Sequence, residues 1–203
     1  MKPKSEFIKA YKDQIPVDLC DKLVSMFNDN KDQQIPGIIS RGAIDVQKST
    51  DMRVVSTLDM WKEVDQMLSA QVSKALEVFY KDHEALRFIS NEFFDSGYYI
   101  QTYDNNDNDE YDWHCDRIGS DTVHRVLTLI VFLNDVEEGG ETEFKYFSNK
   151  IKPLKGSVAI FPASFEYVYR ANKPKSNKKY VLYTFLSHKP VMVKSNHTEL
   201  PKA

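Results

Sequence analysis

The residues best placed to do metal chemistry in this sequence are His114 and Asp116, which are separated by Cys115 near the middle of the chain. Side chains on an extended chain alternate between two faces, so an imidazole and a carboxylate two residues apart point the same way. One strand end can therefore aim a nitrogen ligand and an oxygen ligand at a single point, while Cys115 faces away. Such a pair is half of the 2-His-1-carboxylate arrangement that holds non-haem iron.

The chain around this pair has the pattern of β-strands. Residues 126–133 are apolar at every position except Thr128, and a continuous apolar run is typical of a strand with both faces buried. Aromatic and β-branched residues, which favour strands, recur in short runs separated by turns. About eight strands are predicted, and they include the stretch from about Phe88 to Tyr103 and residues 123–134, 142–147, 158–161, 167–169 and 180–186.

The N-terminal part of the chain is predicted to be helical. Apolar residues recur at spacings of three and four over residues 5–30, and again from Trp61 to about His83. Pro16 interrupts the first stretch, so a second helix is expected from Val17 to Asn28. Helices followed by many strands indicate an α+β, mainly β fold, namely a jelly roll with supporting N-terminal helices.

Size and composition fit one globular domain. The chain has 203 residues, of which 41% are hydrophobic and 28% are charged. No internal repeat or linker is visible, so residues 1–203 are expected to form a single domain, with helical support over about 1–85 and the β core over about 86–190. A net charge of −3 argues against nucleic-acid binding. No apolar run of membrane-spanning length and no secretory signal are visible.

Several short motifs follow one another in a fixed order between about Tyr98 and Leu186. In chain order they are Tyr103, Tyr111-x-x-His114-x-Asp116, Leu127-Thr128-x-x-Val131-Phe132-Leu133-Asn134, Gly139-Gly140-Glu141-Thr142-x-Phe144, Lys155-Gly156-x-x-x-x-Phe161-Pro162 and Lys179-Tyr180. This ordered set resembles the Fe(II)- and 2-oxoglutarate-dependent oxygenases, in particular their prolyl 4-hydroxylase-like branch. The first half of the chain is similar to phage and bacterial members through Ile35-Pro36-Gly37 and Lys48-Ser49-Thr50-Asp51.

The resemblance implies a double-stranded β-helix that binds iron, 2-oxoglutarate and O2, with ascorbate as reductant. His114 and Asp116 match the first two iron ligands. Lys179 matches the basic residue that pairs with the far carboxylate of 2-oxoglutarate, although it also lies in a lysine-rich run typical of a solvated loop. Tyr103 and Thr142 match positions whose hydroxyls can bond the same carboxylate, and their alternative role is ordinary strand packing.

The sequence departs from the family pattern at the distal iron ligand. The family has a His ten positions before the basic residue, and this chain has Tyr169 there. The other histidines, among them His124 and His188, cannot replace it without breaking the order of the strands. Three roles for Tyr169 stay open: a phenolate ligand, a neutral phenol beside iron held by two side chains, or the mark of a protein that no longer does the chemistry. A phenolate would favour Fe(III) over Fe(II).

The function implied by the resemblance is hydroxylation of an unactivated C–H, in first place on a prolyl residue of a peptide or protein. 2-Oxoglutarate would be converted to succinate and CO2. The alternatives are a silent oxygenase-fold module that binds 2-oxoglutarate or a peptide, and a metal-binding fold with another cofactor. Because the chain has only two cysteines, the expected location is the cytoplasm, or the host cytoplasm if the chain is phage-encoded. The oligomeric state is left open.

Overall fold

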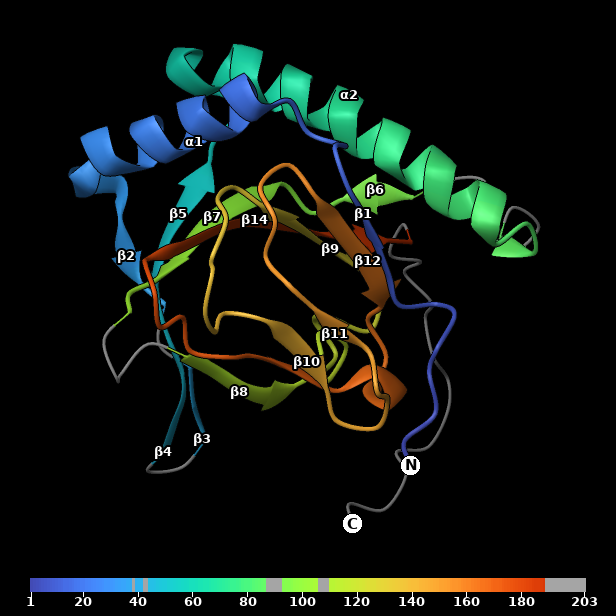
Figure 1. Ribbon diagram of the computed structural model, residues 1–203. Helices are drawn as coiled ribbons and strands as arrows, with labels where there is room; N and C mark the ends of the chain where they lie inside the picture. Colours follow the sequence, from blue (N-terminus) through green and yellow to red (C-terminus); the bar gives the residue numbers. More distant parts are fainter. Residues whose placement is uncertain (38, 42–43, 87–92, 106–109, 189–203) are drawn as a thin grey trace, which may run out of the picture.

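The computed structural model describes residues 1–37, 39–41, 44–86, 93–105 and 110–188 of the chain. Two antiparallel sheets face each other, and two long helices cover the outer face of the larger sheet (Figure 1). This arrangement is the predicted α+β, mainly β fold: a double-stranded β-helix, or jelly roll, with supporting N-terminal helices. No helix in the described ranges is long and apolar enough to cross a membrane.

The larger sheet contains, in spatial order, β1 (Lys9–Tyr11), β12 (Val158–Pro162), β9 (Arg125–Phe132), β14 (Lys179–Ser187), β7 (Tyr98–Tyr103), β5 (Thr50–Val54) and β2 (Ile35–Pro36), and β6 (Phe94–Asp95) pairs with β14. The smaller sheet contains, in spatial order, β11 (Lys150–Ile151), β10 (Thr142–Phe144), β13 (Tyr169–Ala171), β8 (Glu110–His114), β4 (Ile44–Lys48) and β3 (Ile39–Arg41). Short 3₁₀ turns lie at Lys31–Gln33 and Phe165–Tyr167.

Both long helices lie close to their predicted positions. Helix α1 runs from Val17 to Asp29 and helix α2 from Asp59 to Asp82. Their apolar faces bury side chains such as Leu23, Trp61 and Leu68 against one face of the larger sheet. Most of the stability of such amphipathic helices comes from this packing rather than from intrinsic propensity.

The helix expected before Pro16 is wrong. Residues Lys9–Tyr11 form strand β1 at the edge of the larger sheet, with Tyr11 opposite Val158 of β12. Ile8 and Ile15 are buried, but they belong to different apolar clusters. Their spacing matches a helical period, but each side chain is buried in a different place. The strand start expected at Phe88 lies outside the described residues.

Strand β9 has both faces buried, as its continuous apolar run predicted. Leu129 and Val131 pack in the cluster under the helices, whereas Ile130 and Phe132 pack in the cluster between the two sheets. This alternation decides which side chains reach the interior of the jelly roll. Thr128 has the same parity as Ile130, so it also points to the interior.

Candidate active site

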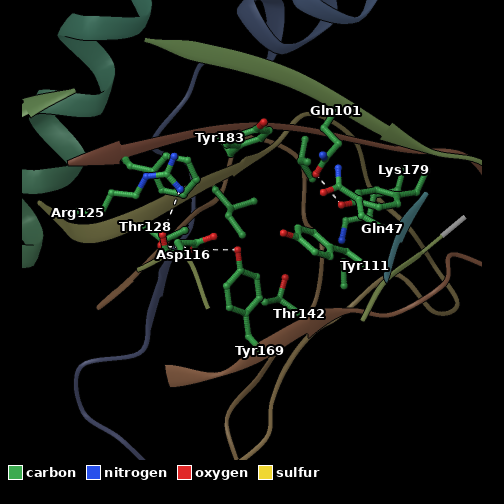
Figure 2. Close-up of a pocket in the computed structure, with 15 residues that line it drawn as sticks. Gln47, Gln101, Tyr111, Asp116, Arg125, Thr128, Thr142, Tyr169, Lys179 and Tyr183 are labelled. Carbon is green, nitrogen blue, oxygen red and sulfur yellow. Dashed lines mark hydrogen bonds between the residues drawn. The ribbon is translucent and has the colours of Figure 1, made fainter. Parts of the chain in front are cut away.

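A cavity of about 200 Å³ lies between the two sheets. Its wall includes most of the site residues predicted from the sequence, shown in Figure 2: Tyr103, Asp116, Thr142, Tyr169 and Lys179. They come from five separate segments: four of them lie on strands, whose alternation turns them inward, and Asp116 follows the end of β8. The structure thus brings the predicted binding residues for metal and cosubstrate into one place.

His114 completes the predicted set at the edge of this cavity. Its Nε2 lies 3.9 Å from Oδ1 of Asp116, and its ring is 3% exposed. Its Nδ1 lies 2.7 Å from the backbone carbonyl oxygen of Asp112. A carbonyl only accepts, so Nδ1 carries the hydrogen and the lone pair of the neutral ring is on Nε2. This tautomer is the one a metal ligand needs, and the contact to Asp112 fixes it.

The donors of His114 and Asp116 suit two positions around one metal ion. Nitrogen and oxygen ligands bind such ions at about 2.1 Å, so two ligands of one ion lie at most ~4.2 Å apart. The 3.9 Å between Nε2 and Oδ1 satisfies that limit. Within the described ranges, no group of three or more His, Cys, Asp or Glu side chains is positioned to hold a metal. The third side of the site is instead formed by a phenol.

Tyr169 is the residue that faces both ligands. It sits directly opposite His114 in the pairing of β13 with β8, and the two ring centroids are 4.1 Å apart. Its hydroxyl donates to Oδ2 of Asp116 at 3.1 Å (Figure 2). Burial, together with the negative charge of Asp116, raises the pKa of Tyr169 well above its ordinary value of 10.0. The side chain is therefore a neutral phenol in this structure.

Two further residues support the ligands, and the sequence reasoning assigned them no role. The hydroxyl of Thr128 donates to Oδ2 of Asp116 at 2.5 Å. The ring of Tyr111 stacks on His114 with centroids 3.4 Å apart and an interplanar angle of 5°. Both residues lie inside motifs named above. Their place in these motifs, together with strand alternation, could have indicated that they point toward the site. Asp116 consequently receives two hydroxyl donors on Oδ2 and turns Oδ1 toward His114.

Lys179 is buried rather than solvated, with 2% of its surface exposed. Its Nζ donates to the carbonyl oxygen of Gly140 at 2.7 Å, in a turn where Gly140 adopts a positive φ of 71°. Burial lowers the pKa of Lys179 from 10.5 to about 7, against the nearby negative charge of Glu141, which raises it. A buried ammonium with a carbonyl partner is well suited to gain an anionic ligand.

Tyr103 and Thr142 line the same cavity as this lysine. Tyr103 is opposite Lys179 in the pairing of β7 with β14, and the ammonium lies 5.5 Å from its ring centroid. Thr142 is 1% exposed and also lines the cavity. Cys115, which was expected to face away from the metal, is absent from the described wall of the cavity and has its sulfur 3.9 Å from the carbonyl oxygen of Arg117.

Comparison with known proteins confirms the resemblance predicted from the motifs. Residues 98–187 match the family model of the 2OG-Fe(II) oxygenase superfamily. Similar folds occur in a viral collagen prolyl hydroxylase from Paramecium Bursaria Chlorella virus-1, solved as a 2OG complex, and in a Pseudomonas putida prolyl-4-hydroxylase. The viral enzyme has a TM-score of 0.67 at 18% identity, covering 90% of this chain and 96% of its own. The Pseudomonas enzyme has a TM-score of 0.67 at 16% identity, covering 91% and 94%.

A prolyl hydroxylase from Trichoplax adhaerens, solved with a peptide fragment of the hypoxia inducible factor oxygen degradation domain, has a TM-score of 0.70 at 13% identity. That match covers 90% of this chain and 84% of the Trichoplax chain. Identities this low show a shared fold. Among curated protein sequences, none matches the chain.

Proposed function

Starting from the match of residues 98–187 to the 2OG-Fe(II) oxygenase superfamily, we propose that this protein is an iron- and 2-oxoglutarate-dependent dioxygenase. Its substrate is a C–H bond of a prolyl residue in a peptide or protein. In the overall reaction, O2 and 2-oxoglutarate are consumed, one oxygen atom enters the substrate as a hydroxyl, and succinate and CO2 leave. The observation that supports this most directly is the buried Lys179, which shares a cavity with Asp116 (Figure 2).

The residues of this chain divide the work between them. His114 and Asp116 hold the iron, which when bound supplies the activation of O2 that no side chain can provide. Lys179 binds the far carboxylate of 2-oxoglutarate, and the hydroxyl of Thr142, which lines the same cavity, is proposed to assist it. Thr128 and Tyr111 keep the two iron ligands in one orientation. Ascorbate serves as the reductant that keeps the iron ferrous.

The helical part of the chain belongs to the same functional unit. Helices α1 and α2 share one apolar cluster with strands of the larger sheet, including Ile100 and Leu182. Those strands also carry Tyr103 and Lys179. The single domain expected from the sequence is therefore proposed to extend over residues 1–203.

A peptide substrate fits the relatives of this fold. The Trichoplax prolyl hydroxylase was solved with a peptide fragment bound. We carry this over as the partner class for the present chain, which thus acts on a proline-containing peptide or protein in the cytoplasm.

One observation favours a second function, a silent module that binds 2-oxoglutarate or a peptide. Tyr169 occupies the third side of the iron site, and its hydroxyl is hydrogen-bonded to the carboxylate that should bind the metal. A neutral phenol is a poor metal ligand, so iron would be held by only two side chains. In this second function the pocket around Lys179 is kept while iron binding is weakened.

Succinate formation from 2-oxoglutarate, measured with iron and ascorbate, distinguishes the two functions. An active oxygenase forms succinate in the wild type, and more of it with a proline-containing peptide that gains one oxygen atom by mass spectrometry. Lys179→Met should abolish the reaction, and Lys178→Met is the matched control that keeps it. No succinate from the wild type, together with binding of 2-oxoglutarate, would favour the silent module. Absence of binding of both 2-oxoglutarate and the proline-containing peptide would contradict both functions.

A further inference from the structure

A row of buried polar side chains leads from strand β5 to the cavity wall at Tyr103. Ser49, Asp51, Gln101 and Tyr103 are 8%, 8%, 6% and 2% exposed. Asp51 lies opposite Gln101 in the pairing of β5 with β7, and Gln101 and Tyr103 line the cavity whereas Asp51 does not. Burial raises the pKa of the Asp51 carboxyl, and the hydrogen bonds from Ser49 and Gln101 oppose this rise. In the described part of the chain, neither a lysine nor an arginine is among the groups that stabilise this carboxylate.

The contacts in this row determine the direction of each hydrogen bond. The side-chain nitrogen of Gln101 lies 3.0 Å and 3.1 Å from the two carboxylate oxygens of Asp51. A carboxylate only accepts, so the amide nitrogen faces Asp51 and the amide oxygen faces the other way. That oxygen is 2.5 Å from the hydroxyl of Tyr103, which must therefore donate to it. The hydrogen of Tyr103 is directed at Gln101 and away from a ligand.

Ser49 reinforces the same direction. Its hydroxyl donates to Oδ1 of Asp51 at 2.8 Å, and the side-chain nitrogen of Gln47 donates to Ser49 at 2.9 Å. Each member of the row thus passes its hydrogen toward the carboxylate. The hydroxyl of Ser49 also has the carbonyl oxygen of Gly37 in reach, at 3.2 Å. The amide of Gln101 resists rearrangement, because turning it would leave Asp51 facing a carbonyl oxygen.

We propose that Asp51 is a positioning residue that, through Gln101, makes the Tyr103 hydroxyl an acceptor toward the cavity rather than a donor. The inference rests on the proposed function in one respect: the ligand whose binding Asp51 affects is taken to be 2-oxoglutarate. A carboxylate ligand near Tyr103 meets oxygen lone pairs there, so its binding depends on Lys179 and Thr142. Asp51 consequently restrains the affinity for the cosubstrate.

The test is the dissociation constant of 2-oxoglutarate, measured by calorimetry with Mn(II) in place of iron. Asparagine offers both a donor and an acceptor, so Asp51→Asn allows Gln101 to turn and Tyr103 to donate to the ligand. We expect Asp51→Asn to bind 2-oxoglutarate about tenfold more tightly, the scale of one hydrogen bond to a charged group. Gln101→Leu, which removes the acceptor of Tyr103, should tighten binding in the same way and serves if Asp51→Asn does not fold.

A double-mutant cycle separates the effect of the Tyr103 hydroxyl on the dissociation constant from the effect of losing the Asp51 charge. In a Tyr103→Phe background, Asp51→Asn should no longer change the dissociation constant. Asp65→Asn, which removes a carboxylate on helix α2, is the matched control and should change nothing. A gain that persists in Tyr103→Phe would show a through-space charge effect and overturn the proposal, as would unchanged or weaker binding in folded Asp51→Asn.

A second measurement does not depend on the cosubstrate. The short bond from Tyr103 to Gln101 should give a downfield, slowly exchanging hydroxyl proton in the NMR spectrum of the wild type. That signal should vanish in both Tyr103→Phe and Asp51→Asn. If the wild type binds no 2-oxoglutarate, the proposed function fails while this signal still decides the hydrogen-bond direction. Its persistence in Asp51→Asn would show that Asp51 does not control Tyr103.

Discussion

The hydroxyl of Tyr169 donates to Oδ2 of Asp116 at 3.1 Å, from the strand that pairs with the one carrying His114. Thr128 donates to the same oxygen at 2.5 Å. One oxygen of the carboxylate is therefore taken up by two hydroxyls, and the other faces Nε2 of His114 at 3.9 Å. The site can bind a metal through one imidazole nitrogen and one carboxylate oxygen, with the phenol as neighbour.

Tyr169→His is expected to raise the affinity for Fe(II) at least about tenfold, the lower end of what a change in ligand support does to metal sites. The imidazole supplies a third protein ligand, a neutral nitrogen, in place of a phenol that is a poor ligand in its neutral form. Chelator competition under anaerobic conditions measures the affinity. Succinate formation should rise in the same variant.

Tyr169→Phe is the control for this prediction, because it removes the hydroxyl and adds no ligand. It should bind iron no more weakly than the wild type, and iron-loaded wild type should show no visible phenolate band. A band in the wild type that is lost in Tyr169→Phe would show that Tyr169 ligates the metal as a phenolate, against this prediction.

The order of helices and strands predicted the jelly roll, and the resemblance of the motifs implied that the site residues meet. Parity along β9 is enough to send Thr128 inward, and motif order is enough to bring His114 and Lys179 to one cavity. Composition alone does not show that Lys179 is buried, because its lysine-rich neighbours, Lys178 among them, are typical of a solvated loop. Its burial depends on the turn at Gly140, which supplies the carbonyl partner.

Two other features could not be predicted from the sequence, for different reasons. Strand β1 has only three residues and pairs with β12, about 150 positions further along the chain, so no local period marks it. The direction of the hydrogen bond from Tyr103 to Gln101 depends on Asp51. In the sequence, Asp51 stands out only as the last residue of the motif Lys48-Ser49-Thr50-Asp51. Hydrogen-bond direction is a property of the whole row and has no signature in residue spacing.

Lys179 makes the stability of the ligand-free protein depend on pH. Its pKa falls from 10.5 to about 7 on folding, so between these values the unfolded chain holds a proton that the folded protein lacks. Stability should therefore rise with pH from about 7 towards 10.5, by no more than about 5 kcal/mol from this group. Lys179→Met should stabilise the protein near neutral pH and lack this rise, whereas Lys178→Met should keep it. Urea unfolding of the three proteins across this pH range measures the free energy of unfolding. If it changed with pH equally in all three proteins, the prediction would be contradicted.

Binding of 2-oxoglutarate should take up a proton above about pH 7. The far carboxylate of the cosubstrate favours the charged form of Lys179 and raises its pKa from about 7. The dissociation constant should then increase as pH rises above that value, because a growing fraction of the lysine must be protonated. Calorimetry at one alkaline pH, in two buffers with different ionisation enthalpies, gives the number of protons taken up. No uptake would mean that Lys179 is already charged or does not meet the ligand.

Thr128→Val should weaken the binding of Fe(II) or Mn(II) by about tenfold or more, because the hydroxyl that orients Asp116 is lost while the shape of the side chain is kept. Asp116 keeps Tyr169 as a donor, so the free energy of unfolding should fall by only ~1–3 kcal/mol. Thr184→Val is the matched control, since Thr184 is a buried threonine of β14 that the structure does not place in the cavity wall. Calorimetric titration with Mn(II) compares the three proteins. Equal loss of metal affinity in both variants would assign the effect to general disturbance of the sheet, and no loss in Thr128→Val would show that Tyr169 alone suffices to orient Asp116.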